Sequence, residues 1–187
     1  MTKTVFLSGS RKIGRLNDLV RHRLQNMLDQ EFHVIVGDAN GADRAFQGYL
    51  AEKGYQDVSV FCSGSSCRNN VGQWSVRSVQ VDPKLKGRAF YTQKDKEMAA
   101  EADYGFVIWD GKSEGSINNI FELLKKGKKA VVYLSRSKSF RNIKSAKDIE
   151  DLLEESEISI SHRSGGSSLI DQHLNDFRLS QQGSFNL

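Results

Sequence analysis

A glycine- and serine-bearing loop between a strand and a helix has the residue types of an anion-binding site. The run Tyr104–Trp109 is apolar and rich in aromatic and β-branched residues, as expected of a strand buried on both faces. The loop Asp110–Ser116 follows it, and Ile117, Ile120 and Leu124 then recur at helical spacing. A helix N-terminus offers unpaired backbone N–H groups and a partial positive charge, and glycine lets a phosphate approach closely. We therefore expect a ligand at this loop.

Two earlier loops have the same position between a strand and a helix. The strand Thr4–Leu7 leads into Ser8–Arg11, and the strand Phe32–Val36 leads into Gly37–Asp43. In a parallel sheet, ligands bind beyond the carboxyl ends of the strands, where the strand order reverses. The three loops are therefore expected to converge on one rim.

The elements that must position these loops alternate between strand and helix. Further apolar runs, Val58–Phe61 and Ala130–Leu134, continue the alternation. This pattern predicts right-handed βαβ units, and so an α/β fold: a Rossmann-like three-layer domain with a mostly parallel sheet flanked by helices. We expect this domain to span residues 1–135.

Composition and charge limit the classes of function that are possible. The chain has 187 residues and a net charge of +4, and no apolar run approaches the length that spans a bilayer. The segment 61–100 carries seven Lys/Arg against three acids, a surplus that faces an anionic ligand, a nucleic acid or solvent. Cys62 and Cys67 are expected to be free thiols rather than metal ligands, in a cytoplasmic protein without cofactor or metal.

The remaining segments show weaker patterns. The stretch 62–91 has no lasting period and is expected to be a long irregular loop, either a ligand-binding flap or disordered. A helix is predicted over Thr92–Ala102, with Thr92 as its cap. A polar connector and a short acidic helix beginning at Ser145 are predicted within 136–158, and a C-terminal tail of low order over 159–187, in which Ile170, Leu174 and Phe177 could form a helical turn.

Three stretches resemble the SLOG superfamily of Rossmann-like domains. They are VFLSGSR, VIVGDANGADRAFQGYLAEKG and KDKEMAAEADYGFVIWDGKSEGSINNIFELLKKGKKAVVYL. The superfamily includes the Lonely Guy phosphoribohydrolases, the YspA-like proteins and the DNA-processing DprA proteins, and the third stretch is also similar to 2′-deoxynucleoside 5′-monophosphate N-hydrolases. The motif Gly-Asp-Ala-Asn-Gly-Ala-Asp-Arg is the most specific and points to the YspA-like branch. The resemblance covers about half of the chain.

The resemblance implies that the protein binds a nucleotide or nucleotide-derived sugar phosphate, and family habit implies a possible homodimer. The first ligand loop would be Ser8, Gly9, Ser10 and Arg11, and the second Gly37, Asp38, Gly41, Ala42 and Asp43. The phosphate would be held by Ser113, Gly115 and Ser116.

Hydrolysis of an N-glycosidic bond is the reaction that the resemblance suggests. Asp95 matches an aspartate of the deoxynucleotide hydrolases, but their helix glutamate corresponds here to Asn119, which can orient a ribose hydroxyl and cannot act as nucleophile or base. Glu114 or Glu122 could substitute, although a full helical turn displaces a group by about 5 Å. The alternatives are a non-catalytic nucleotide sensor and a DprA-like nucleic-acid-binding protein, whose binding would depend steeply on salt.

Several candidates have two interpretations each. Arg11 either clamps an anion or lies on the surface. Asp38 and Asp43 either contact ribose or a metal, or Asp38 orders its own turn and Asp43 complements the helix dipole in a first turn. Trp109 either packs at the strand end or stacks on a base, and Asp110 either binds ribose or forms a turn.

Overall fold

The computed structural model describes residues 2–156 together with 172, 174, 175, 177 and 179. The described chain folds into a sheet in the order β4-β3-β2-β1-β5-β6-β7, parallel except for β7. The strands are β1 (Thr4–Gly9), β2 (His33–Gly37), β3 (Val58–Ser63), β4 (Ser75–Val79), β5 (Tyr104–Trp109), β6 (Lys129–Leu134) and β7 (Ser139–Ile143). The helices are α1 (Asp18–Asp29), α2 (Ala42–Glu52), α3 (Gly87–Glu101), α4 (Glu114–Lys125) and α5 (Ala146–Glu155).

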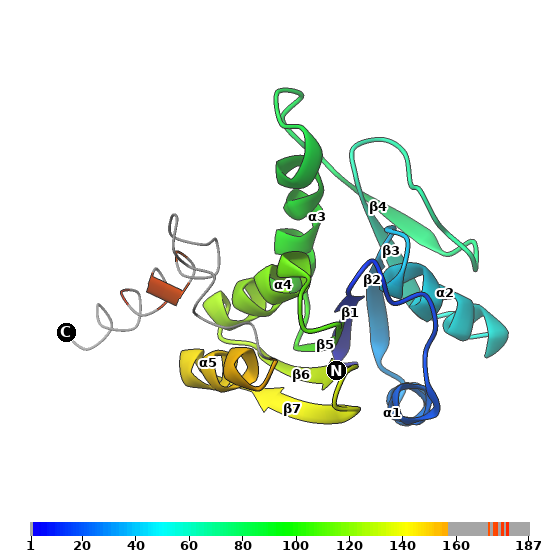
Figure 1. The fold of residues 1–187 in the computed structure, drawn as a ribbon. Helices are drawn as coiled ribbons and strands as arrows, with labels where there is room; N and C mark the ends of the chain where they lie inside the picture. The colour runs from blue at the N-terminus through cyan, green and yellow to red at the C-terminus, as the bar shows by residue number, and fades with distance from the viewer. Residues whose placement is uncertain (1, 157–171, 173, 176, 178, 180–187) are drawn as a thin grey trace.

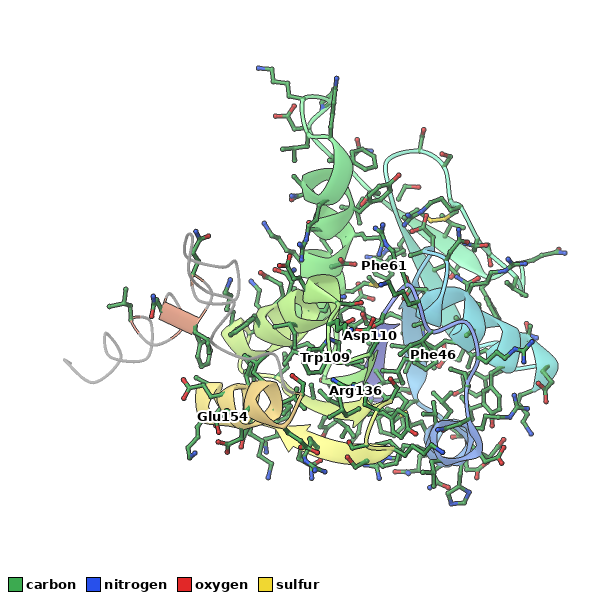
Figure 2. All side chains as sticks on the ribbon, viewed as in Figure 1. Phe46, Phe61, Trp109, Asp110, Arg136 and Glu154 are labelled. Atoms are coloured by element: carbon green, nitrogen blue, oxygen red, sulfur yellow. A yellow bond between two sulfur atoms is a disulfide. The ribbon has the colours of Figure 1, made fainter. Side chains whose placement is uncertain are left out.

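Helices cover both faces of this sheet, which confirms the predicted three-layer Rossmann-like α/β class. Figure 1 shows α1 and α2 on one side and α3, α4 and α5 on the other. Alternate residues of each strand enter two separate cores, so that Phe106 joins Phe46 beneath α2 while Phe61 and Trp109 pack on the opposite face (Figure 2). Trp109 is fully buried, which confirms its packing interpretation and excludes base stacking.

The strand order reverses at β1, which lies between β2 and β5. The chain runs from β1 through β2 and β3 to β4 at one edge of the sheet. It then returns to place β5 on the other side of β1. Such a switch point leaves a crevice at the carboxyl ends of the two strands. Here those ends are Gly9 of β1 and Trp109 of β5, which lead into two of the predicted ligand loops.

Regular structure extends further than the sequence predicts. The stretch 62–91, expected to be irregular, contains the edge strand β4 and the first turn of α3. Only Val79 of β4 is buried, so this strand lacks a readable alternation. Helix α3 begins at Gly87, and Thr92 is not its cap; the Thr92 hydroxyl instead donates to the Arg88 carbonyl at 2.5 Å.

The C-terminal predictions have mixed outcomes. The connector after β6 contains β7, which pairs antiparallel with β6. The sequence pattern did not predict this strand. The acidic helix is confirmed as α5, where Ser145 and Asp148 form a capping box. Leu174 and Phe177 are helical and buried in the core on the α4 and α5 face, whereas Ile170 lies outside the described residues. In the described part of the chain, we find no helix with the length and apolar character needed to cross a membrane.

The α2-side core should tolerate truncation poorly. We expect Phe106→Ala, which removes a fully buried ring 6.0 Å from that of Phe46, to lower the free energy of unfolding by about 3–5 kcal/mol. The control Leu19→Ala, at a side chain on the surface of α1, should change it by less than about 0.5 kcal/mol. Urea denaturation measures both, and similar losses in the two variants would contradict this placement of the core.

Candidate functional site

The three predicted loops meet at one buried residue, Ser10. Its backbone N–H donates to the Ile108 carbonyl at 2.9 Å, and its carbonyl accepts from the Ala42 N–H at 3.2 Å. Its hydroxyl accepts from the Asp110 N–H at 3.1 Å and lies 3.2 Å from the Ser116 hydroxyl. Ser10 thereby joins the loop after β1 to β5, to the first turn of α2 and to the first turn of α4.

A cavity of about 480 Å³ opens where these loops meet. It lies in the size range of small-molecule binding sites. The predicted site residues that line it are Ser8, Gly9, Ser10, Arg11, Asp43, Asp95, Ser113, Gly115, Ser116 and Asn119. The predicted residues outside its lining are Gly37, Asp38, Gly41, Ala42, Asp110, Glu114 and Glu122.

The N-terminus of α4 faces this cavity without a side-chain cap among the described residues. The N-cap hydroxyl of Ser113 donates instead to Asp110 at 2.8 Å. Asp110 also accepts the N–H groups of Lys112 and Ser113, so its carboxylate orders its own turn, and the turn interpretation is confirmed. A Cβ on Gly115 would meet only open space, so a ligand can approach the backbone there.

Three of the predicted glycines serve packing. A Cβ on Gly9 would collide with the Ile108 carbonyl, and one on Gly41, where φ is +81°, with the Arg11 backbone. A Cβ on Gly37 would collide with the Asp43 carboxylate and the Lys94 ammonium group. These glycines let neighbouring loops and charges approach one another.

The cavity lining is cationic. Among the described residues that line it, five carry a positive charge and two carry a carboxylate; the cations are Arg11, Lys12, Arg68, Arg88 and Lys94. The Arg68 guanidinium lies 4.1 Å from the centre of the Tyr91 ring, and that of Arg11 lies 5.8 Å from it. Arg11 thus lies in the cavity lining, and its role as an anion clamp stays a prediction.

Asp38 binds Arg68 rather than facing the cavity. The carboxylate accepts from the Arg68 backbone N–H at 3.0 Å, from Nε at 3.1 Å and from Nη2 at 2.7 Å. Burial alone would raise the pKa of Asp38, but the hydrogen bonds from Arg68 outweigh it and lower the pKa below its usual value. Asp38 therefore forms an ion pair that positions the loop after β3 and does not order its own turn, while its predicted ribose contact stays a prediction.

A buried charge cluster forms the wall beneath α3. The Lys94 ammonium group is 2.7 Å from the Asp95 carboxylate, and Lys94 is only 4% exposed. Burial alone would lower the pKa of Lys94, but Asp95 and Asp43 outweigh it and the pKa is raised. Burial raises the pKa of Asp43 to about 6, against the opposing effect of Lys94, while Asp95 and Asp38 add to the rise and the Ala39 N–H hydrogen bond opposes it.

Two neighbouring amides of α4 have buried atoms without a partner in the described structure. Asn119 Nδ2 donates to the Ser8 hydroxyl at 2.6 Å, while Asn119 Oδ1 and Asn118 Nδ2 have no hydrogen bond. Both residues line the cavity and are more than nine-tenths buried. A buried polar atom without a partner costs about 1–3 kcal/mol of stability.

The two candidate glutamates have other partners. Glu114 pairs with Arg88 at the cavity rim, and Glu122 is buried 3.3 Å from the Lys125 ammonium group. Neither residue is among those that line the cavity. Asp43 and Asp95 are the acids in the described lining.

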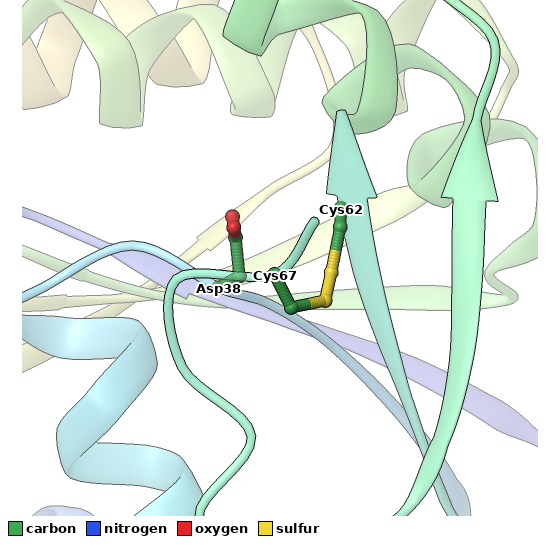
Figure 3. A group of neighbouring side chains, drawn as sticks. All are labelled: Asp38, Cys62 and Cys67. Carbon is green, nitrogen blue, oxygen red and sulfur yellow. A yellow bond between two sulfur atoms is a disulfide. The ribbon is translucent and has the colours of Figure 1, made fainter. Parts of the chain in front are cut away.

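The cysteines form a disulfide, so the expectation of free thiols is wrong. Cys62 at the end of β3 is bonded to Cys67, because the loop after β3 folds back and brings the two Cα atoms to 5.3 Å. Asp38 lies beside both sulfurs, a grouping with the composition of a metal site (Figure 3). With both sulfurs in the disulfide and Asp38 bound by Arg68, these groups are not available as metal ligands.

The residues that sequence reasoning missed come mainly from segment 62–101. They include Arg68, Arg88, Tyr91 and Lys94, which approach the loops only because β4 and α3 fold against β3. The basic surplus of this segment was the available signal, and three of its seven cations line the cavity. Comparison with family models, curated proteins and solved structures finds no match to this chain.

Stability should depend on pH through Asp43. Its pKa of about 6 exceeds the ordinary 3.8, so the folded state holds this proton more tightly. The resulting stabilisation is fully present below about pH 4 and is lost as pH rises through about 6, a change on the order of 3 kcal/mol. We expect the difference in unfolding free energy between wild type and Asp43→Asn to follow this course in urea denaturation. A difference that stays constant over that range would contradict the raised pKa.

Proposed function

We propose that this protein binds a nucleotide or a nucleotide-derived sugar phosphate in the cavity at the carboxyl ends of β1 and β5. The observation that carries the proposal is the uncapped N-terminus of α4, which opens into a cavity with five cations against two carboxylates. A helix N-terminus and fixed cations both favour a phosphate. The sequence resemblance to the SLOG superfamily supports the same ligand class.

The phosphate would lie against the backbone of Gly115 and Ser116. Gly115 leaves open space for it, and the Ser116 hydroxyl, already oriented by Ser10, could donate to it. Arg11 would approach from the loop after β1. The sugar would then extend toward Asn119 and Asn118, whose orphaned amide atoms suit hydroxyl groups, because a hydroxyl both donates and accepts.

One carboxylate in the cavity lining supports hydrolysis of an N-glycosidic bond. Asp95 lines the cavity and is held by Lys94, so it could stabilise a developing positive charge on the sugar. With Asn119 at the usual glutamate position and Glu114 and Glu122 outside the lining, binding without turnover is the outcome that we favour.

A ligand panel tests the proposal. The purified protein is incubated with ribonucleoside and deoxynucleoside monophosphates and NAD-type dinucleotides, and free base, sugar phosphate and bound nucleotide are followed by chromatography with mass detection. Binding without base release supports a sensor. Base release that Asp95→Asn abolishes would make the protein an N-glycosidase. If the protein neither binds nor turns over any member of the panel, the proposal is refuted. A nucleic acid or protein partner is then favoured.

The phosphate position is tested by Gly115→Asp. A carboxylate at this position of α4 would repel an anion, and we expect the affinity for inorganic pyrophosphate to fall at least about tenfold in calorimetric titration. The fold should persist, because an acid in the first turn of a helix is favourable and the added Cβ meets open space.

The matched control is Gly48→Asp. Gly48 lies within α2, its Cβ would also meet open space, and it is outside the cavity lining. Its affinity for pyrophosphate should stay within about twofold of wild type. Equal affinity in Gly115→Asp and Gly48→Asp would refute the placement of the phosphate at α4.

A further inference from the structure

The loop between β3 and β4 forms a wall of the cavity through a single long side chain. Residues 64–70 leave the end of β3 and turn back over the loop after β2. Of this segment, Arg68 lines the cavity. What fixes the position of Arg68 therefore affects any anion bound there.

Three contacts hold Arg68 in position. Asp38 accepts three hydrogen bonds from it, and the Tyr91 ring packs against its guanidinium. The third constraint is covalent, because the preceding residue, Cys67, is bonded to Cys62 at the buried end of β3. The disulfide thus connects the backbone that carries Arg68 directly to the sheet.

We propose that the Cys62–Cys67 disulfide regulates the anion site, by holding Arg68 against Asp38 and Tyr91, and that reduction of the disulfide weakens anion binding. This inference rests on the proposed function, since it concerns the affinity of the same cavity. It adds a redox response that the binding proposal does not require.

The effect of reduction should be local. Beyond Arg68 the loop is fastened by Asn69, which donates to the Asp38 carbonyl at 2.7 Å, and by Gln47, which accepts from the Val71 N–H at 2.9 Å. Before Cys67, the Gly64 N–H donates to the Val79 carbonyl, while Ser65 and Ser66 are exposed. Reduction therefore frees the short stretch before Arg68 and leaves the rest of the loop attached.

The chemistry is ordinary thiol–disulfide exchange. Cys67 is partly exposed and Cys62 is fully buried, so an external thiolate would attack the Cys67 sulfur and release the Cys62 thiolate, which takes up a proton. A second thiol then attacks the mixed disulfide. Two electrons pass from the reductant, which leaves as its own disulfide, and the protein retains two thiols.

Calorimetric titration with inorganic pyrophosphate tests the proposal on oxidised and dithiothreitol-reduced protein, with the thiol count verified for each. We expect reduction to raise the dissociation constant by about threefold to tenfold, as for loss of one well-placed charged contact. The double variant Cys62→Ala/Cys67→Ala should bind pyrophosphate as weakly as the reduced protein, and dithiothreitol should not change its affinity. Arg68→Gln should also bind weakly and show no redox response.

The outcomes separate the two proposals. Equal or tighter binding after reduction would overturn the redox inference and leave the binding proposal intact. No binding in either state would overturn the binding proposal, and the redox inference with it. A redox response that persists in Arg68→Gln would overturn the assigned route through Arg68. Thermal unfolding of each protein shows whether a loss of affinity is a loss of fold, and unfolding on reduction would overturn the local mechanism.

Discussion

The candidate site depends on the hydrogen bonds of one buried serine. Ser10 binds β5 through its N–H group, the start of α2 through its carbonyl, and the Asp110 and Ser116 positions through its hydroxyl. Loops from three parts of the chain thus share one residue, and its small side chain lets them approach. Because these hydrogen bonds are buried, a donor or acceptor left without its partner costs more free energy than a hydrogen bond lost at the surface. The arrangement is therefore fixed before any ligand binds.

A second constraint is the burial of charge beneath α3. Burial would lower the pKa of Lys94, but the neighbouring Asp95 and Asp43 carboxylates raise it, and Gly37 leaves the space for these groups to approach one another. Removing charges from water generally costs more than their attraction returns, so a buried ion cluster is weak evidence of stabilisation. Its location in the wall of a cavity is better explained by what it does there: it keeps a cation and a carboxylate in fixed positions.

The sequence predicted the framework of the site because simple rules connect pattern to position. Alternating strands and helices imply a parallel sheet, and a parallel sheet brings the loops at Ser10, Asp43 and Gly115 to one rim. The wall contributed by Arg68 and Tyr91 could not be predicted in this way. It depends on an exposed edge strand without alternation, and on a loop whose path follows from a disulfide and an ion pair. At Gly9 and Gly41 the structure adds a packing reason for glycine that the sequence pattern did not indicate.

The cavity therefore has two halves of different origin. The half built from β1, β5 and α4 is attached to the centre of the sheet, where strands have neighbours on both sides. The other half comes from the loop before the edge strand β4 and from α3, whose first turns extend beyond the sheet (Figure 1). Edge elements make fewer buried contacts and open more easily than central ones. It follows that the outer half of the cavity, which includes Arg68 and Tyr91, can change in conformation while the central half stays in place.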